Sequence, residues 1–288
     1  MAARKACDRP MGDSALKSAG LLPIALLLAT GCAQPRPAVA RVVGRFRAPE
    51  ATQGVAVDSH FFYAIANAEI GKYEKGTGGR VGGWKGPAGG SITHLNSGLV
   101  IGHELYCAHS NYPHTPMVSS VEVFDTDRML HLRSLALPSG LGSATWLAYA
   151  DESWWVTFAN YSGKGGEAGH GSAATRLVRL AVDWRPAQMW TFPDSVIARW
   201  GTMSSSGGTL AGSRVFYTTG HDAPEIYVVE VPRAGTELKL RTIIRTESQG
   251  QGLAFDRAER RLYSIQRRTG EVIVSVLPEL GSSGVQFP

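Results

Sequence analysis

The sequence has few charged residues and few cysteines. Asp, Glu, Lys and Arg make up 18% of the 288 residues, against 43% hydrophobic residues, which excludes a disordered chain and a coiled coil. No apolar run reaches the roughly 20 residues that span a bilayer, so a polytopic membrane protein is excluded as well. The chain is instead rich in turn-forming residues, with 34 glycines and 15 prolines, which indicates a globular protein with many turns.

The positive charge is too small to favour a nucleic acid as partner. The formal net charge is +5, and the first 31 residues contribute four basic and two acidic side chains, so the remainder carries +3. A nucleic-acid-binding domain usually has a stronger basic bias. We therefore expect no nucleic acid among the partners.

The N-terminus has the pattern of a secretory signal. A basic cluster in residues 1–20 precedes a short apolar run at residues 21–29, and Ala29-Thr30-Gly31-Cys32 resembles the bacterial lipobox. That resemblance implies cleavage before Cys32 and acylation of its thiol. We expect a signal peptide at 1–31, a linker at 32–40 and a single domain at 41–288. The predicted location is the cell envelope, attached to the membrane through Cys32, with plain secretion as the alternative.

One thiol is left in the mature domain. Cys7 lies in the predicted signal and Cys32 would be acylated, so Cys107 has no partner for an intramolecular disulfide. Cys107 lies in an apolar strand pattern, which predicts a buried, unreactive thiol.

An aromatic residue followed by a small-residue strand and a polar loop recurs five times. The five aromatic residues are Tyr63, Tyr106, Trp155, Tyr217 and Tyr263. Their spacings are 43, 49, 62 and 46 residues, and the longest contains a Gly-rich insertion at 163–175. The underlying period is about 48 residues, which is the length of a four-stranded propeller blade.

The last repeat lacks an outer strand, whereas residues 41–46 form a strand pattern that belongs to no repeat. We expect these two parts to pair and close the ring, because an open ring would expose sheet edges. The sequence therefore predicts an all-β fold, a β-propeller of five four-stranded blades closed by an N-terminal strand. Six blades are the alternative, since residues 195–210 are difficult to assign.

Three segments, at residues 110–126, 142–146 and 219–228, resemble a bacterial and fungal set of β-propellers labelled "cycloisomerase". This set is grouped with lactonase-like, NHL-repeat and gluconolactonase-like proteins. The resemblance covers about residues 41–278 and implies the propeller fold and a lactonase or cycloisomerase as one activity. The gluconolactonase resemblance implies a Glu, Asn and Asp cage around a divalent cation, for which Asn160 and Asp222 are candidates and no matching Glu is identified.

One face of the propeller is expected to carry the site. The inner strand of each blade begins on the face where the second strand ends, and the loops of the opposite face are short hairpins. The inner strands begin at small or amide polar residues next to glycine: Gln53, Asn96, Ser143, Ser206 and Gln251. The loops after the second strands add Asn111, Tyr112, Asn160, Tyr161 and Arg267. We predict that these ten residues bind ligand; the alternative is that the glycines and amides only allow close strand approach and satisfy backbone groups.

Candidate catalytic residues on the same face are His109 and His221 as general bases, with Asp222 as an orienting partner or metal ligand. The sequence contains neither an HxH or HxxH spacing nor a GxSxG motif. The metal is therefore undetermined, and a divalent cation is the one cofactor that the resemblance suggests.

Three functions compete at this point. The first is a monomeric binding module for a small polar molecule, a glycan or a peptide. The second is an enzyme of the lactonase or cycloisomerase kind, and the third is a scaffold for an envelope complex. The absence of a recognisable catalytic constellation favours the binding module.

Overall fold

The computed structural model describes residues 38–279. The predicted signal peptide, the acylation site Cys32 and most of the predicted linker lie outside the described residues. No helix within the described range is long and apolar enough to cross a membrane.

Residues 38–279 form five antiparallel sheets of four strands, and one sheet has an additional short strand. Blade 1 consists of β3 (Gly54–Val57), β4 (Phe61–Ala66), β5 (Glu69–Glu74) and β6 (Arg80–Lys85). Blade 2 consists of β7 (Leu95–Ile101), β8 (Glu104–Ser110), β9 (Ser119–Asp125) and β10 (Leu130–Ala136). Blade 3 consists of β11 (Ser143–Ala150), β12 (Ser153–Ala159), β13 (Arg176–Leu180) and β14 (Pro186–Thr191). Blade 4 consists of β15 (Gly207–Gly212), β16 (Val215–Thr219), β17 (Glu225–Glu230) and β18 (Lys239–Arg245), and blade 5 consists of β19 (Leu253–Asp256), β20 (Arg261–Gln266), β21 (Glu271–Val276) and β2 (Arg41–Arg47).

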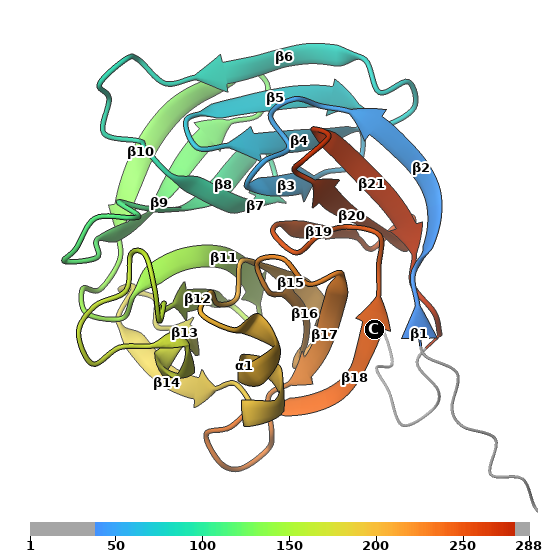
Figure 1. The fold of residues 1–288 in the computed structure, drawn as a ribbon. Coiled ribbons are helices and arrows are strands. Elements are labelled where there is room, and N and C mark those ends of the chain that lie inside the picture. Colours follow the sequence, from blue (N-terminus) through green and yellow to red (C-terminus); the bar gives the residue numbers. More distant parts are fainter. Residues whose placement is uncertain (1–37, 280–288) are drawn as a thin grey trace, which may run out of the picture. The chain divides into compact units, whose positions relative to one another are not determined.

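The five blades surround one axis, with the inner strands β3, β7, β11, β15 and β19 in contact around the ring (Figure 1). The five-bladed propeller is thus confirmed, and the six-bladed alternative is wrong. Residues 195–210 do not form a sixth blade, because they contain most of the helix α1 (Asp194–Trp200) and the beginning of β15. All five repeated aromatic residues lie on second strands, and all are buried except Tyr106, which is half-buried.

The N-terminal strand closes the ring as predicted. β2 pairs antiparallel with β21, from Arg41 opposite Val276 to Arg47 opposite Glu271, and supplies the outer strand of blade 5. The Phe46 ring stacks on the Phe62 ring of blade 1 with 5.1 Å between centroids. Before β2, the short strand β1 (Ala38–Val39) pairs in parallel with β18 of blade 4. Residues 38–47 thereby connect blades 4, 5 and 1.

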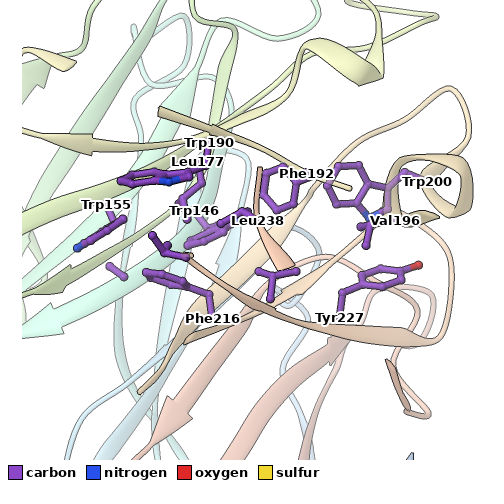
Figure 2. Close-up of a cluster of buried hydrophobic side chains, with 13 residues drawn as sticks. Trp146, Trp155, Leu177, Trp190, Phe192, Val196, Trp200, Phe216, Tyr227 and Leu238 are labelled. Atoms are coloured by element: carbon purple, nitrogen blue, oxygen red, sulfur yellow. The ribbon is translucent and has the colours of Figure 1, made fainter. Parts of the chain in front are cut away.

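Large aromatic side chains fill the space between blades 3 and 4 (Figure 2). Trp155 stacks on Trp190 with centroids 5.4 Å apart and also contacts Phe216 of the neighbouring blade. The helix α1 adds Val196 and Trp200 to this cluster. Asp194 in the first turn of α1 and Arg199 in the last turn both complement the helix dipole. Cys107 is fully buried in another cluster, and burial raises the pKa of its thiol, in agreement with the predicted unreactive side chain.

Deletion of residues 41–47 tests the closure of the ring. The deletion removes one complete strand ladder and the Phe46 contact, so we expect the free energy of unfolding to fall by at least about 3 kcal/mol in urea titrations. The control is Val43→Ala on the same strand, whose side chain is 41% exposed and whose loss should cost less than about 1 kcal/mol. An unchanged urea midpoint for the deletion would show that β2 contributes nothing to closure.

Candidate functional site

The inner strands are packed extremely closely where they begin. A Cβ on Gly252 would lie 2.4 Å from Cα of Gly54, and a Cβ on Gly207 would lie 2.1 Å from the Gln251 carbonyl oxygen. Only glycine fits such positions. The residues just before these glycines, Gln53, Ser206 and Gln251, line a pocket.

This polar pocket has a volume of about 150 Å³. All five blades contribute to it, through the starts of their inner strands or through the loops that follow their second strands. Its lining residues are Gln53, His94, Asn96, Tyr112, Thr145, Tyr161, Met203, Ser206, His221, Gln251 and Arg267. Eight of the thirteen residues predicted for the catalytic or ligand-binding site are in this set.

The structure therefore brings together Gln53, Asn96, Tyr112, Tyr161, Ser206, His221, Gln251 and Arg267. The other five predicted residues, Asn111, Ser143, Asn160, His109 and Asp222, do not line the pocket. Three of them satisfy nearby protein groups instead. Asn111 bonds the Pro116 carbonyl and the Val118 N–H within its own loop, Asn160 donates to the Leu141 and Ala174 carbonyls, and the Ser143 hydroxyl donates to Ser110.

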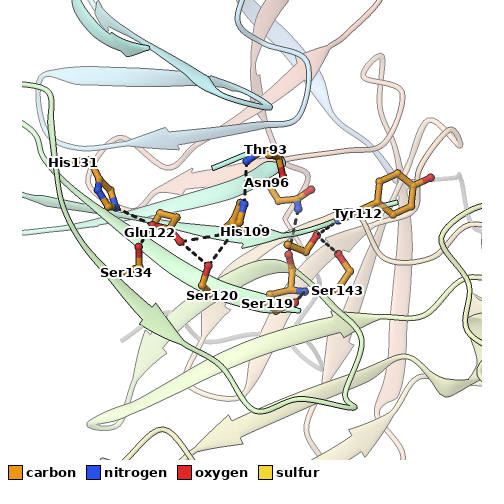
Figure 3. A network of polar contacts seen from close by, with 12 residues as sticks. Thr93, Asn96, His109, Tyr112, Ser119, Ser120, Glu122, His131, Ser134 and Ser143 are labelled. Atoms are coloured by element: carbon orange, nitrogen blue, oxygen red, sulfur yellow. Dashed lines mark hydrogen bonds and ion pairs between the residues drawn. The ribbon is translucent and has the colours of Figure 1, made fainter. Parts of the chain in front are cut away.

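His109 lies in a buried hydrogen-bond network (Figure 3). Its Nε2 accepts from the Thr93 N–H at 3.2 Å, so the proton is on Nδ1, which lies 2.8 Å from the Ser120 hydroxyl. Ser120 in turn donates to Glu122, whose other oxygen lies 2.8 Å from His131 Nε2. Burial lowers the pKa of His109, although the neighbouring Glu122 carboxylate acts in the opposite direction. His109 thus holds the segment that carries His94.

His221 connects the one arginine of the pocket with an acidic residue. Arg267 Nη1 lies 3.0 Å from His221 Nε2, and because a guanidinium only donates, Nε2 is the acceptor. His221 Nδ1 lies 2.8 Å from an Asp222 carboxylate oxygen, outside good hydrogen-bond geometry. The Asp222 side chain is 79% exposed. The nitrogen that a general base would use is occupied by Arg267.

His94 is the histidine that the sequence analysis missed. Its Nδ1 lies 2.9 Å from Asn67 Oδ1, which leaves Nε2 without the proton in the neutral ring. Burial lowers the pKa of His94 to about 4, with smaller contributions from His109 and Arg267. The ring is therefore neutral at physiological pH.

An aromatic wall forms one side of the pocket. The centroids of His94 and Tyr112 lie 5.0 Å apart, and Tyr112 meets Tyr161 edge to face at 5.1 Å. The Gly-rich insertion holds Tyr112 from behind: Gly165 has a φ of +77°, and a Cβ there would lie 2.4 Å from the Tyr112 ring. Met203 packs beside Tyr161 and completes this wall.

The sequence analysis missed three pocket residues, namely His94, Thr145 and Met203. Two of them have a recognisable signal in the sequence. His94 directly precedes the inner strand of blade 2, as Gln53 and Ser206 precede β3 and β15. Thr145 follows Ser143 by two positions on β11, but the register shift between Ala144 and Trp146 alters the simple alternation there. Met203 lies in the loop after α1 and carries no such signal. Within residues 38–279, no group of three or more His, Cys, Asp or Glu side chains could hold a metal ion.

No protein-family model matches the chain, and no curated protein sequence matches it significantly. Among solved structures, the glutaminyl cyclase of Myxococcus xanthus is similar with a TM-score of 0.57 at 11% identity, covering 86% of this chain and all of that one. The fold is a propeller fold. The RRP9 WD40 repeats match with a TM-score of 0.43 at 11% identity, over 78% of this chain and 67% of theirs. Kuenenia stuttgartiensis hydrazine synthase matches with a TM-score of 0.46 at 10% identity, over 77% of this chain and 82% of that one. At these identities the likeness shows the fold alone, and the NHL, lactonase and cycloisomerase resemblance stays a prediction.

The low pKa of His94 predicts a loss of stability in acid. The unfolded chain binds a proton at this ring near pH 6.5 and the folded chain only near pH 4, so stability is complete above 6.5 and falls as the pH drops toward 4. His109 contributes with the same sign. Urea titrations at pH 7 and at pH 4 give the free energy of unfolding at each pH. Between the two, this free energy should fall by roughly 1 to 3 kcal/mol less in His94→Gln than in the wild type. The exposed His114→Gln should behave as wild type; equal losses in all three proteins would contradict the assignment.

Proposed function

We propose that this protein is an exported binding module that holds a small polar ligand in the pocket at the mouth of its central channel. The propeller is the rigid scaffold, and the loops after its second strands supply Tyr112, Tyr161, His221 and Arg267. Rigid positioning of this kind lowers the entropy cost of holding a ligand.

Gln251 is the observation that carries the proposal. Its φ of +63° lies in the left-handed region, which favours glycine. The chain has glycine at both neighbouring positions but glutamine at this one. Gln251 is 2% exposed as a residue, and it lines the pocket. An unfavourable backbone conformation lowers stability. A ligand that bonds this amide explains why a glutamine is kept there.

The size of the pocket limits the ligand. The volume of about 150 Å³ equals that of a protein cavity that can bind benzene. Binding sites for drug-sized molecules are larger, at about 300 to 1,000 Å³. Among the predicted ligand classes, this volume favours a small molecule, or the end of a glycan or peptide chain, over an extended polymer.

An enzyme of the lactonase or cycloisomerase kind is the second candidate, favoured by the approach of Asp222 to His221. The glutaminyl cyclase neighbour is, by its name, an enzyme on a related fold. Two features favour binding over catalysis. Arg267 occupies His221 Nε2, and a histidine with a pKa of about 4, as for His94, is a weak base at neutral pH. Turnover of a lactone or of a glutaminyl peptide by the purified domain, lost in His221→Ala, would reverse this ranking.

Gln251→Gly separates ligand binding from stability. Glycine relieves the left-handed conformation and removes the amide, so we expect the free energy of unfolding to stay equal or rise by up to about 1 kcal/mol. Thermal-shift screening with small polar molecules should identify ligands that stabilise the wild type and bind at least about tenfold more weakly to Gln251→Gly, as for one lost hydrogen bond. Gln266→Gly, outside the pocket, is the matched control for ligand affinity. Equal affinities in all three proteins would refute a binding role for Gln251.

We also propose that the protein is attached to a membrane of the cell envelope by an acyl chain on Cys32. The support is the short apolar run followed by Ala29-Thr30-Gly31-Cys32. The full-length chain should fractionate with membranes when expressed in a bacterial host, and Cys32→Ser should be soluble or remain unprocessed. Cys107→Ser is the matched control and should remain in the membrane fraction. Membrane fractionation and processing of Cys32→Ser identical to those of the wild type would exclude this anchor.

A further inference from the structure

We infer that the pocket recognises a carboxylate group of its ligand, and that Arg267 is the residue that binds it. This inference rests on the proposed binding function and specifies the chemical class of the ligand.

The lining of the pocket has one permanent positive charge and no acidic side chain. Arg267 is the charged member of the lining set, in which the remaining polar residues are neutral amides, hydroxyls and histidines. The pKa of His94 near 4, which burial causes, keeps that ring uncharged, and the donor from Arg267 occupies His221 Nε2. The pocket therefore presents a net charge of one, which matches a monoanion.

Arg267 differs from the paired arginines of the propeller. Arg133 lies 2.6 Å from Glu104 and Arg199 lies 2.8 Å from Glu225, so those guanidinium groups are neutralised by carboxylates. Within the described residues, Arg267 has no carboxylate partner, and its hydrogen bond goes to a neutral imidazole. Asp222 approaches the opposite nitrogen of that imidazole, so its charge lies behind His221 rather than in the pocket.

The bond to His221 orients the guanidinium. Nη1 is held by the imidazole, which leaves the Nη2 and Nε donors of the planar fork for a ligand. Such a fork matches the two oxygens of a carboxylate. The aromatic wall of His94, Tyr112 and Tyr161 suits a flat body on the carboxylate, and the Gln53 and Gln251 amides suit further polar groups.

Calorimetry with matched probes tests the inference. Acetate and benzoate are titrated into the purified domain beside acetamide and benzamide, which have the same shape without the charge. Both carboxylates should bind at least about tenfold more tightly than their amides, because a charge-assisted hydrogen bond is roughly twice as strong as a neutral one. Benzoate should bind more tightly than acetate because its ring reaches the aromatic wall. Inorganic phosphate should bind more weakly than benzoate, since it carries more charge than the pocket offsets.

Three variants locate the effect. Arg267→Gln should remove the preference for carboxylates, and Arg267→Lys should retain part of it, since it keeps the charge and loses the fork. Arg268→Gln removes the same charge from the adjacent, exposed position and should bind as wild type. Urea titration verifies that each variant is folded, and a variant that does not fold is replaced by Arg267→Met.

The outcomes separate this inference from the proposed function. Equal affinity for carboxylates and amides would overturn the carboxylate inference and leave a neutral-ligand pocket. Tighter binding of phosphate than of benzoate would overturn it in favour of a phosphate site. An equal loss in Arg268→Gln would assign the effect to general surface charge and overturn the role of Arg267. If none of these probes binds, both the carboxylate inference and the small-ligand function are refuted.

Discussion

The close approach of the inner strands at the axis is the constraint on which the rest of the structure depends. Gly54, Gly207 and Gly252 lie against the backbone of a neighbouring blade, where any side chain would collide. These positions therefore leave no room for a side chain, and the polar side chains of the pocket come from neighbouring positions and from the loops after the second strands. A ring of polar side chains around a small pocket is a geometric consequence of closing five blades. Function is then determined by which side chains occupy that ring.

The sequence was sufficient to predict the ring and its closure. Five aromatic residues at similar spacing mark the second strands, and the strand at 41–46 had no other partner than the incomplete last repeat. The sequence leaves six blades as an alternative because α1 interrupts the repeat between blades 3 and 4. A helix has a different hydrophobic periodicity from a strand, so a search for repeated strands does not detect a helix inserted between two blades.

The same reasoning predicts thirteen site residues, of which the structure brings eight together at one pocket. Tyr112 and Tyr161 line the pocket, whereas the amides directly before them, Asn111 and Asn160, bond backbone groups of their own or a neighbouring loop. Neighbouring loop residues with equal polarity can thus have opposite roles, because the fold of each loop decides which one faces the axis. Sequence spacing gives the end of the strand and not the direction of each side chain beyond it.

Burial determines which side chains of the pocket are charged. A histidine in water would be partly protonated near neutral pH, and two protonated rings beside Arg267 would give a strongly cationic site. Desolvation instead keeps His94 neutral, and His221 remains an acceptor for Arg267. The buried network of His109, Ser120 and Glu122 holds the backbone N–H of Thr93, so the backbone next to His94 is anchored by the protein itself. The positive charge of the pocket is thereby concentrated on one oriented guanidinium, which is the geometry that the proposed recognition of a carboxylate requires.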